Sequence, residues 1–205
     1  VVHEESIKKV YDDILDRFNR IDILINAAGG NMPGATISAG RNIFDLDIEQ
    51  FKNVTDLNLN GTVLPTLIFS RAMAEQKSGS IINISSVAAQ QAVTRVMGYS
   101  AAKAAVENFT RWMAIEMAHK FGNGIRVNAI APGFFLTSQN NSLLTNPDGS
   151  LTERGRTIIA RTPFKRFGEP DELVGAVLFL SSDASAFVTG TVIAVDGGFS
   201  VFSGV

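Results

Sequence analysis

Tyr99-Ser-Ala-Ala-Lys103 follows the apolar run Gly79-Ser-Ile-Ile-Asn-Ile-Ser-Ser86, with Tyr99 thirteen positions after Ser86, and these two stretches decide the fold. The run predicts a buried strand ending at Ser86, and the second stretch predicts the start of a helix. A tyrosine and a lysine four residues apart share one helix face, so the ammonium can stabilise the phenolate. With the Ser86 hydroxyl brought over the first helical turn, these groups predict carbonyl reduction or alcohol oxidation.

Hydrophobic periodicity and turn residues predict an alternation of helices and strands along the chain. We expect helices over 7–20, 47–76, 99–121, 151–160 and 170–180, and strands over 21–25, 80–84, 125–130 and 191–195. Gly61 and Pro65 are expected to interrupt the second helix. This order predicts an α/β, doubly wound, Rossmann-like parallel sheet that binds ligands at its carboxyl edge, where Asn26, Ser86 and Pro132 each follow a strand.

Composition excludes several other classes of protein. The 205 residues are 45% hydrophobic with a formal charge of -2, which predicts one domain over 1–205 and gives no reason to expect nucleic acid or an anionic membrane as partner. Without cysteine there is no disulfide or thiolate site, and His3 and His119 are too far apart to suggest a metal site. No apolar run reaches the ~18 to 20 residues of a membrane span, and no signal peptide is apparent, so we expect a cytoplasmic protein.

Four further motifs accompany the Ser86, Tyr99 and Lys103 pattern. They are Asn26-Ala-Ala-Gly29, Asn58-Leu-Asn-Gly61, Pro132-Gly133 with Thr137, and Val195-Asp-Gly-Gly198. In this order the chain resembles the short-chain dehydrogenase/reductase family over nearly its whole length. Ala27 departs from the family's Asn-Asn-Ala-Gly signature, which has a second asparagine there.

The resemblance implies an oxidoreductase in which Tyr99 is the general acid in reduction and the base in oxidation. Lys103 would lower the pKa of Tyr99 and hold the nicotinamide ribose. Ser86, which the spacing selects over Ser85, would hydrogen-bond the substrate oxygen. Asn58 is unfavourable within a helix and would hold a water that relays protons to Lys103, the alternative being a local kink. The alternative for Tyr99 and Lys103 is an ordinary packed or solvated pair of helix residues.

The same resemblance implies NAD or NADP as cofactor. The residues that would bind it are Asn26, Ala27, Ala28, Gly29, Tyr99, Lys103, Pro132, Gly133 and Thr137, although Pro-Gly alone is also typical of a turn. The glycine-rich turn that holds the pyrophosphate in such folds is absent from the sequence. We therefore expect the chain to be the C-terminal two-thirds of a family member, without the first three strands, and to bind dinucleotide poorly by itself.

The substrate is predicted to be a small molecule, most simply a sugar acid. The segment 137–150 is rich in amides and hydroxyls, which suits a polyhydroxylated ligand, and the candidate substrate contacts are Arg95, Gln139 and Asn140; a solvated surface is the alternative for each. The stretch 131–140 and the ending 197–205 resemble the D-mannonate oxidoreductase (fructuronate reductase) branch. Another sugar, polyol or gluconate dehydrogenase, or an acyl-carrier-protein ketoreductase, is the alternative within the family.

Two expectations concern association between subunits. The resemblance implies a homodimer or homotetramer, in which the long helices pair and the apolar tail with Phe199, Phe202 and Val205 is covered. From a different class of function, the chain could be an inactive fragment that acts only in subunit association.

Overall fold

The computed structural model describes residues 1–38, 40–137 and 140–204. Its strands form one parallel sheet in the order β1-β2-β3-β4. The strands are β1 (Ile23–Asn26), β2 (Gly79–Ile84), β3 (Ile125–Pro132) and β4 (Val192–Val195). The α-helices are α1 (Glu4–Phe18), α2 (Ile48–Thr55), α3 (Gly61–Gln76), α4 (Met97–Phe121), α5 (Asn141–Leu144), α6 (Glu153–Arg161) and α7 (Val174–Ser181). Short 3-10 turns are η1 (Pro33–Ala35), η2 (Ile43–Asp45), η4 (Val87–Ala89), η5 (Pro170–Leu173) and η6 (Asp183–Ser185), and η3 (Asp56–Asn60) is π-helical.

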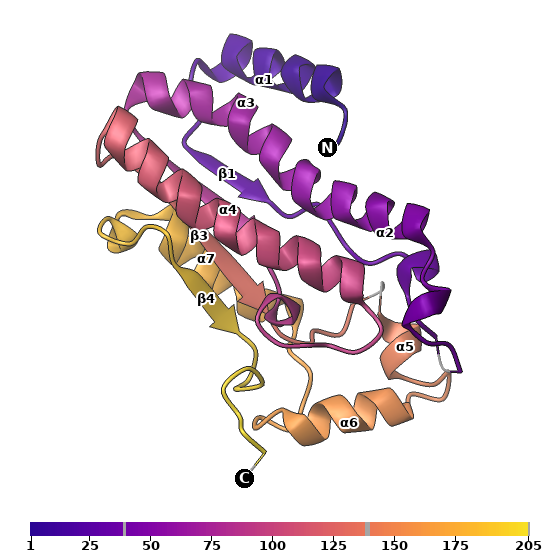
Figure 1. Ribbon diagram of the computed structural model, residues 1–205. Coiled ribbons are helices and arrows are strands. Elements are labelled where there is room, and N and C mark those ends of the chain that lie inside the picture. Colours follow the sequence, from indigo (N-terminus) through magenta and orange to yellow (C-terminus); the bar gives the residue numbers. More distant parts are fainter. Residues whose placement is uncertain (39, 138–139, 205) are drawn as a thin grey trace.

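Helices cover both faces of the sheet, as the sequence predicted for a doubly wound fold (Figure 1). On one face, α1, α3 and α4 enclose a core that includes Met73, Ile81 and Val127. On the other face, α7 packs on a second core around Ile82, Ile130 and Leu180. Because β2 and β3 are covered on both sides, their side chains are almost all buried, as is typical of inner parallel strands.

Strand β1 lies at one edge of the sheet and pairs with β2 alone among the described residues. The side chains of Ile23 and Ile25 are 45% and 44% exposed. The edge strand is therefore apolar and partly uncovered, which is unusual because such edges promote aggregation.

The long helical segment 48–76 departs from the prediction at one point. Asp47 caps it through the amides of Glu49 and Gln50, as expected, but the helix is interrupted over Asp56–Asn60 and continues through Gly61 and Pro65. The cause is the Asn58 side chain, whose Nδ2 donates to the carbonyl of Val54 one turn earlier at 2.8 Å. An amide that bonds this carbonyl competes with the helix ladder, and the turn widens.

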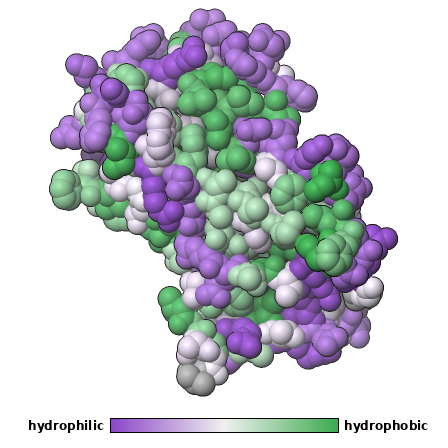
Figure 2. All heavy atoms as spheres, in the orientation of Figure 1, coloured by the Kyte–Doolittle hydropathy of each residue, from purple (hydrophilic) through white to green (hydrophobic). Residues whose placement is uncertain are grey.

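Hydrophobic residues gather on the surface over α3 and α4, whereas α1 presents mainly hydrophilic residues (Figure 2). Exposed apolar side chains on these two helices include Leu67 and Ile115, at 47% and 58% exposure. Within the part of the chain that the structure describes, no helix combines the length and apolar character needed to cross a membrane.

Candidate active site

The carboxyl edge of the sheet brings together the residues that the sequence singled out. Ser86 follows β2 and begins the turn η4, while Tyr99 and Lys103 lie in the first two turns of α4. Asn58 lies in the π-helical turn η3, which packs against α4. A π-helical turn within an α-helix is common at functional sites, so its position beside Lys103 is a local signal of a site.

Tyr99 lies beside Ser86, whose side chain lowers the pKa of the phenol, but burial raises the pKa of Tyr99 by more. The expectation that Lys103 lowers the pKa of Tyr99 stays a prediction. The Lys103 Nζ atom is 5.7 Å from the centroid of the tyrosine ring, and it donates a 2.7 Å hydrogen bond to the carbonyl of Ile84 instead. The ammonium thus stays near the ring while its bond goes to the end of β2.

Lys103 is almost fully buried, with 4% of its surface exposed. Burial lowers the pKa of this lysine to about 8, because the charged form loses its hydration. None of the described carboxylates forms an ion pair with it. A buried lysine whose protonation changes near neutral pH is typical of a functional site.

Asn58 holds the loop that follows β1, whose Gly29 lies close to this lysine. Its side chain donates to the carbonyl of Gly30 at 2.7 Å and accepts from the Gly30 amide at 3.0 Å. A Cβ atom at Gly29, which has φ +154°, would lie 2.6 Å from Asn58 Oδ1 and 3.3 Å from Lys103 Nζ. The loop backbone therefore approaches the buried amide and ammonium as closely as only glycine allows.

The two adjacent serines have different surroundings. Ser85 Oγ points inward and donates to the Glu107 carboxylate at 3.0 Å, whereas Ser86 Oγ accepts from the amide of Ala88 at 3.2 Å and lies beside Tyr99. The Ser85 hydroxyl therefore bonds a buried group and does not face Tyr99. The Ser86 hydroxyl is the one placed next to the phenol.

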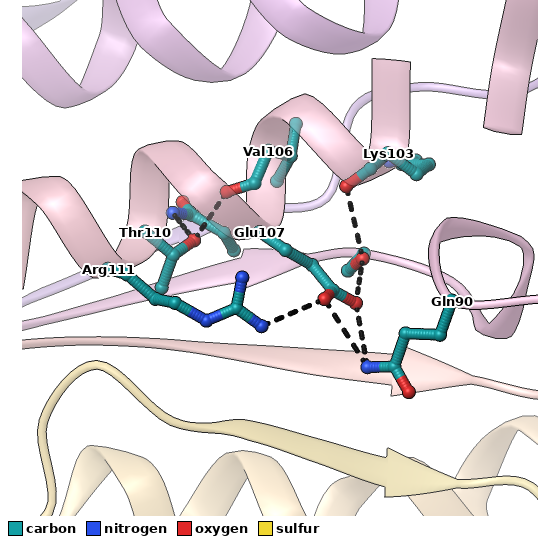
Figure 3. A network of polar contacts seen from close by, with 8 residues as sticks. Gln90, Lys103, Val106, Glu107, Thr110 and Arg111 are labelled. Atoms are coloured by element: carbon teal, nitrogen blue, oxygen red, sulfur yellow. Dashed lines mark hydrogen bonds and ion pairs between the residues drawn. The ribbon is translucent and has the colours of Figure 1, made fainter. Parts of the chain in front are cut away.

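Glu107 is a functional candidate that the sequence did not reveal. Its carboxylate is buried and accepts from Ser85, from Gln90 Nε2 at 3.1 Å, and from Arg111 Nη2 at 3.1 Å (Figure 3). The carboxylate therefore ties the loop after β2, which carries Ser86, to the middle of α4, which carries Lys103. Its position eight residues after Tyr99, on the helix face that meets the sheet, was the only signal available from the sequence.

Replacing Glu107 with Ala is expected to lower the free energy of unfolding by about 2 to 3 kcal/mol, because the Ser85 hydroxyl and the Gln90 amide lose a buried charged partner. Arg111→Ala is the matched comparison. The Arg111 side chain in this ion pair is half exposed, so Arg111→Ala is expected to lower the free energy of unfolding by less than about 1 kcal/mol. Urea unfolding of both variants measures the difference, and equal losses would contradict a role for Glu107 beyond the ion pair.

Asn26 is buried and its amide is used within the fold. Nδ2 donates to Thr66 Oγ1 and to Asn83 Oδ1, both at 2.8 Å, and Asn83 in turn donates to Thr110. This chain of bonds joins β1 and β2 to α3 and α4. The contact of Asn26 with a cofactor stays a prediction, while Ala27, Ala28 and Gly29 lie in the partly exposed loop that follows it.

The end of β3 and the loop after it carry the other predicted contacts. The Gly133 backbone packs against Asp196 at the end of β4, and Pro132 and Thr137 are half-buried. Asn140 uses its amide within this loop, where Oδ1 accepts from the Thr137 amide and Nδ2 donates to the Phe135 carbonyl, and its contact with a substrate stays a prediction. Gln139 and Val205 lie outside the described residues. Arg95 is exposed just before α4.

The predicted apolar tail is covered in part by its own chain. Phe199 makes an edge-to-face contact with Phe134, with ring centroids 5.1 Å apart, and Phe202 is half-buried. Covering this tail therefore does not require a second subunit at Phe199.

Comparison with known proteins gives one family match and many relatives. A family model described as enoyl-(acyl carrier protein) reductase matches residues 1–200. The uncharacterised oxidoreductase UxuB of Bacillus subtilis is 45% identical over 214 residues, which cover 100% of this chain and 76% of that protein. A crystal structure from Haemophilus influenzae, provisionally assigned as a D-mannonate oxidoreductase and holding NAD, is 44% identical with a TM-score of 0.91 and the same coverage, 100% and 76%. A gluconate 5-dehydrogenase from Burkholderia cenocepacia in complex with NADP and tartrate is 33% identical with a TM-score of 0.83, over 97% of this chain and 72% of that one.

Proposed function

The chain belongs to the short-chain dehydrogenase/reductase family and is an oxidoreductase, and from this we propose that it interconverts a keto sugar acid and its hydroxy acid, of the D-fructuronate and D-mannonate type. The observation that carries the proposal is the meeting of Tyr99, Ser86 and Lys103 at the carboxyl edge of the sheet. The similarity to a structure provisionally assigned as a D-mannonate oxidoreductase supports the choice of substrate. The tartrate in a related gluconate dehydrogenase supports a hydroxy acid more generally.

The family uses a nicotinamide cofactor, which when bound supplies or accepts the hydride. The residues present fit its nicotinamide ribose end. Lys103 provides a buried ammonium, and the Gly29 backbone leaves no room for a side chain beside it. We propose that Lys103 and the loops of Asn26 to Gly29 and Pro132 to Thr137 hold that end of NAD or NADP.

In reduction, the Tyr99 phenol donates the proton that the substrate oxygen needs, and in oxidation the phenolate removes it. The Ser86 hydroxyl, which lies beside the phenol, donates a hydrogen bond to the same oxygen as negative charge develops there. Asn58 keeps the loop over Lys103 in place through its two bonds to Gly30, so the lysine is positioned before substrate arrives. A water held by Asn58 that relays protons to Lys103 remains part of the proposal.

We expect the protein, expressed at its natural full length, to reduce NAD or NADP when supplied with D-mannonate. The measurement follows the absorbance of the reduced nicotinamide, with D-gluconate, D-mannitol and, in the reverse direction, a 3-oxoacyl thioester as competing substrates. Preference for D-gluconate or the thioester would reassign the substrate within the family. Absence of turnover with every substrate would favour the association-only alternative.

We also propose that the protein forms a homodimer or homotetramer. The hydrophobic surface over α3 and α4 supports this, because contiguous apolar surface on a soluble protein commonly marks an interface (Figure 2).

A further inference from the structure

The structure contains a pocket of about 470 Å³ next to α6. One wall is the loop from Gln91 to Arg95, which joins Ser86 to Tyr99 along the chain, and another is one face of α6. The aromatic pair Phe134 and Phe199 completes it. This volume is within the range of ligand pockets, which hold roughly 300 to 1,000 Å³.

The pocket is unusually basic. Arg95, Arg154 and Arg161 line it, against the single carboxylate of Glu153. Among the described residues none of these guanidinium groups forms an ion pair. Arg154 reaches only Thr94, through two 3.4 Å contacts, and both burial and the charge of Arg95 lower its pKa. The positive charges of these arginines therefore repel one another, and a bound anion would reduce that repulsion.

Arg95 is also held in a costly backbone conformation. Its φ is +77°, in the left-handed region that residues other than glycine rarely adopt, and its carbonyl accepts a 3.0 Å bond from the Ile37 amide. Such strain persists where the surrounding structure fixes it, often at ligand sites. Arg95 is four residues before Tyr99, so their Cα atoms are at most about 14 Å apart, a gap that two side chains and a six-carbon acid can span.

We infer that Arg154, together with Arg95, binds the carboxylate of the substrate, while Phe134 and Phe199 contact its carbon chain. This inference rests on the proposed function and explains why that function would require an acid. Arginine suits the role because its planar guanidinium group bonds both oxygens of a carboxylate. One feature of the sequence indicates this basic site: Arg154 and Arg161 are seven residues apart and so share a helix face.

The test uses two ligands with the same carbon skeleton, D-mannonate and uncharged D-mannitol, titrated calorimetrically into the full-length protein in the presence of NAD. We expect D-mannonate to bind at least about tenfold more tightly, and the double variant Arg95→Gln/Arg154→Gln to lose that preference. Arg156→Gln is the matched control, because Arg156 lies on α6 but outside the pocket. It should keep the preference, and Arg154→Lys, which retains the charge without the planar fork, should keep part of it.

Equal affinity for both ligands in the unaltered protein, no binding of D-mannonate, or a preference that survives in the double variant would overturn the inference. So would a double variant that loses both ligands together, because the arginines would then act on the fold. A different result would reject the proposed reaction while leaving the carboxylate site in place. If D-mannonate binds with the expected preference but does not reduce the cofactor, the carboxylate site is supported and the reaction is rejected.

Discussion

Tyr99→Phe is expected to reduce turnover by about 10² to 10⁴-fold, the usual contribution of a positioned general acid or base. The phenol lies beside the Ser86 side chain and near a buried ammonium, and the substitution removes only the hydroxyl that exchanges the proton. Affinity for the nicotinamide cofactor should change little. The measurements are steady-state turnover with D-mannonate and a fluorescence titration of the reduced cofactor.

Tyr11→Phe is a matched control, since Tyr11 is the other of the two tyrosines in the chain. It packs edge-to-face on Phe69, with ring centroids 5.8 Å apart, in the core beneath α1. The same loss of one hydroxyl at this position should leave turnover unchanged. Undiminished turnover in Tyr99→Phe would instead reject Tyr99 as the proton donor.

The alternation of strands and helices was predictable because each buried strand is a short apolar run bounded by turn residues. The run before Ser86 became β2, and the strand expected over 125–130 became β3, which extends to Pro132, so both ends lie within two residues of the expected ones. Parallel strands share one carboxyl edge, so the meeting of Ser86 with Tyr99 and Lys103 also followed from topology. These parts of the fold depend on local patterns that the sequence displays directly.

Other features depend on contacts between distant segments. The amide of Asn58 bonds Val54 and Gly30, so it widens the helix at a point where propensity alone favoured Gly61 or Pro65. The amide of Asn140, a predicted substrate contact, also bonds the backbone of Phe135 and Thr137 in the loop after β3, which the sequence did not indicate. A side chain rich in hydrogen-bonding groups has several possible partners, and only the packed structure decides among them.

The pKa shifts of Tyr99 and Lys103 also could not be predicted from the sequence. Four-residue spacing correctly placed Lys103 near Tyr99, but spacing carries no information on burial. In the structure burial dominates, raising the pKa of Tyr99 and lowering that of Lys103. The site therefore has a lysine that loses its charge near pH 8, which leads to a prediction about stability as well as activity.

Lys103→Met is expected to reduce turnover by about 10² to 10³-fold and, at pH 7, to raise the free energy of unfolding by about 2 kcal/mol. The folded-state pKa is about 8 against an ordinary value of 10.5, so burial of the charge costs about 3 kcal/mol at 1.4 kcal/mol per pKa unit. Loss of the bond from Nζ to the Ile84 carbonyl offsets about 1 kcal/mol of that gain. Urea unfolding and steady-state kinetics at pH 7 measure the two effects.

The pH dependence separates this charge effect from a change in packing. Between pH 8 and 10.5 the unfolded chain binds more protons at Lys103 than the folded chain, so this lysine makes stability rise with pH in that window. Lys103→Met should remove that rise, while Lys120→Met, at an exposed position on the same helix, should preserve it. If turnover requires the charged form of Lys103, turnover of the unaltered protein should fall above about pH 8. A stability profile identical in Lys103→Met and the unaltered protein would show that Lys103 is not titrating in the folded interior, and that its charge is not held there for catalysis.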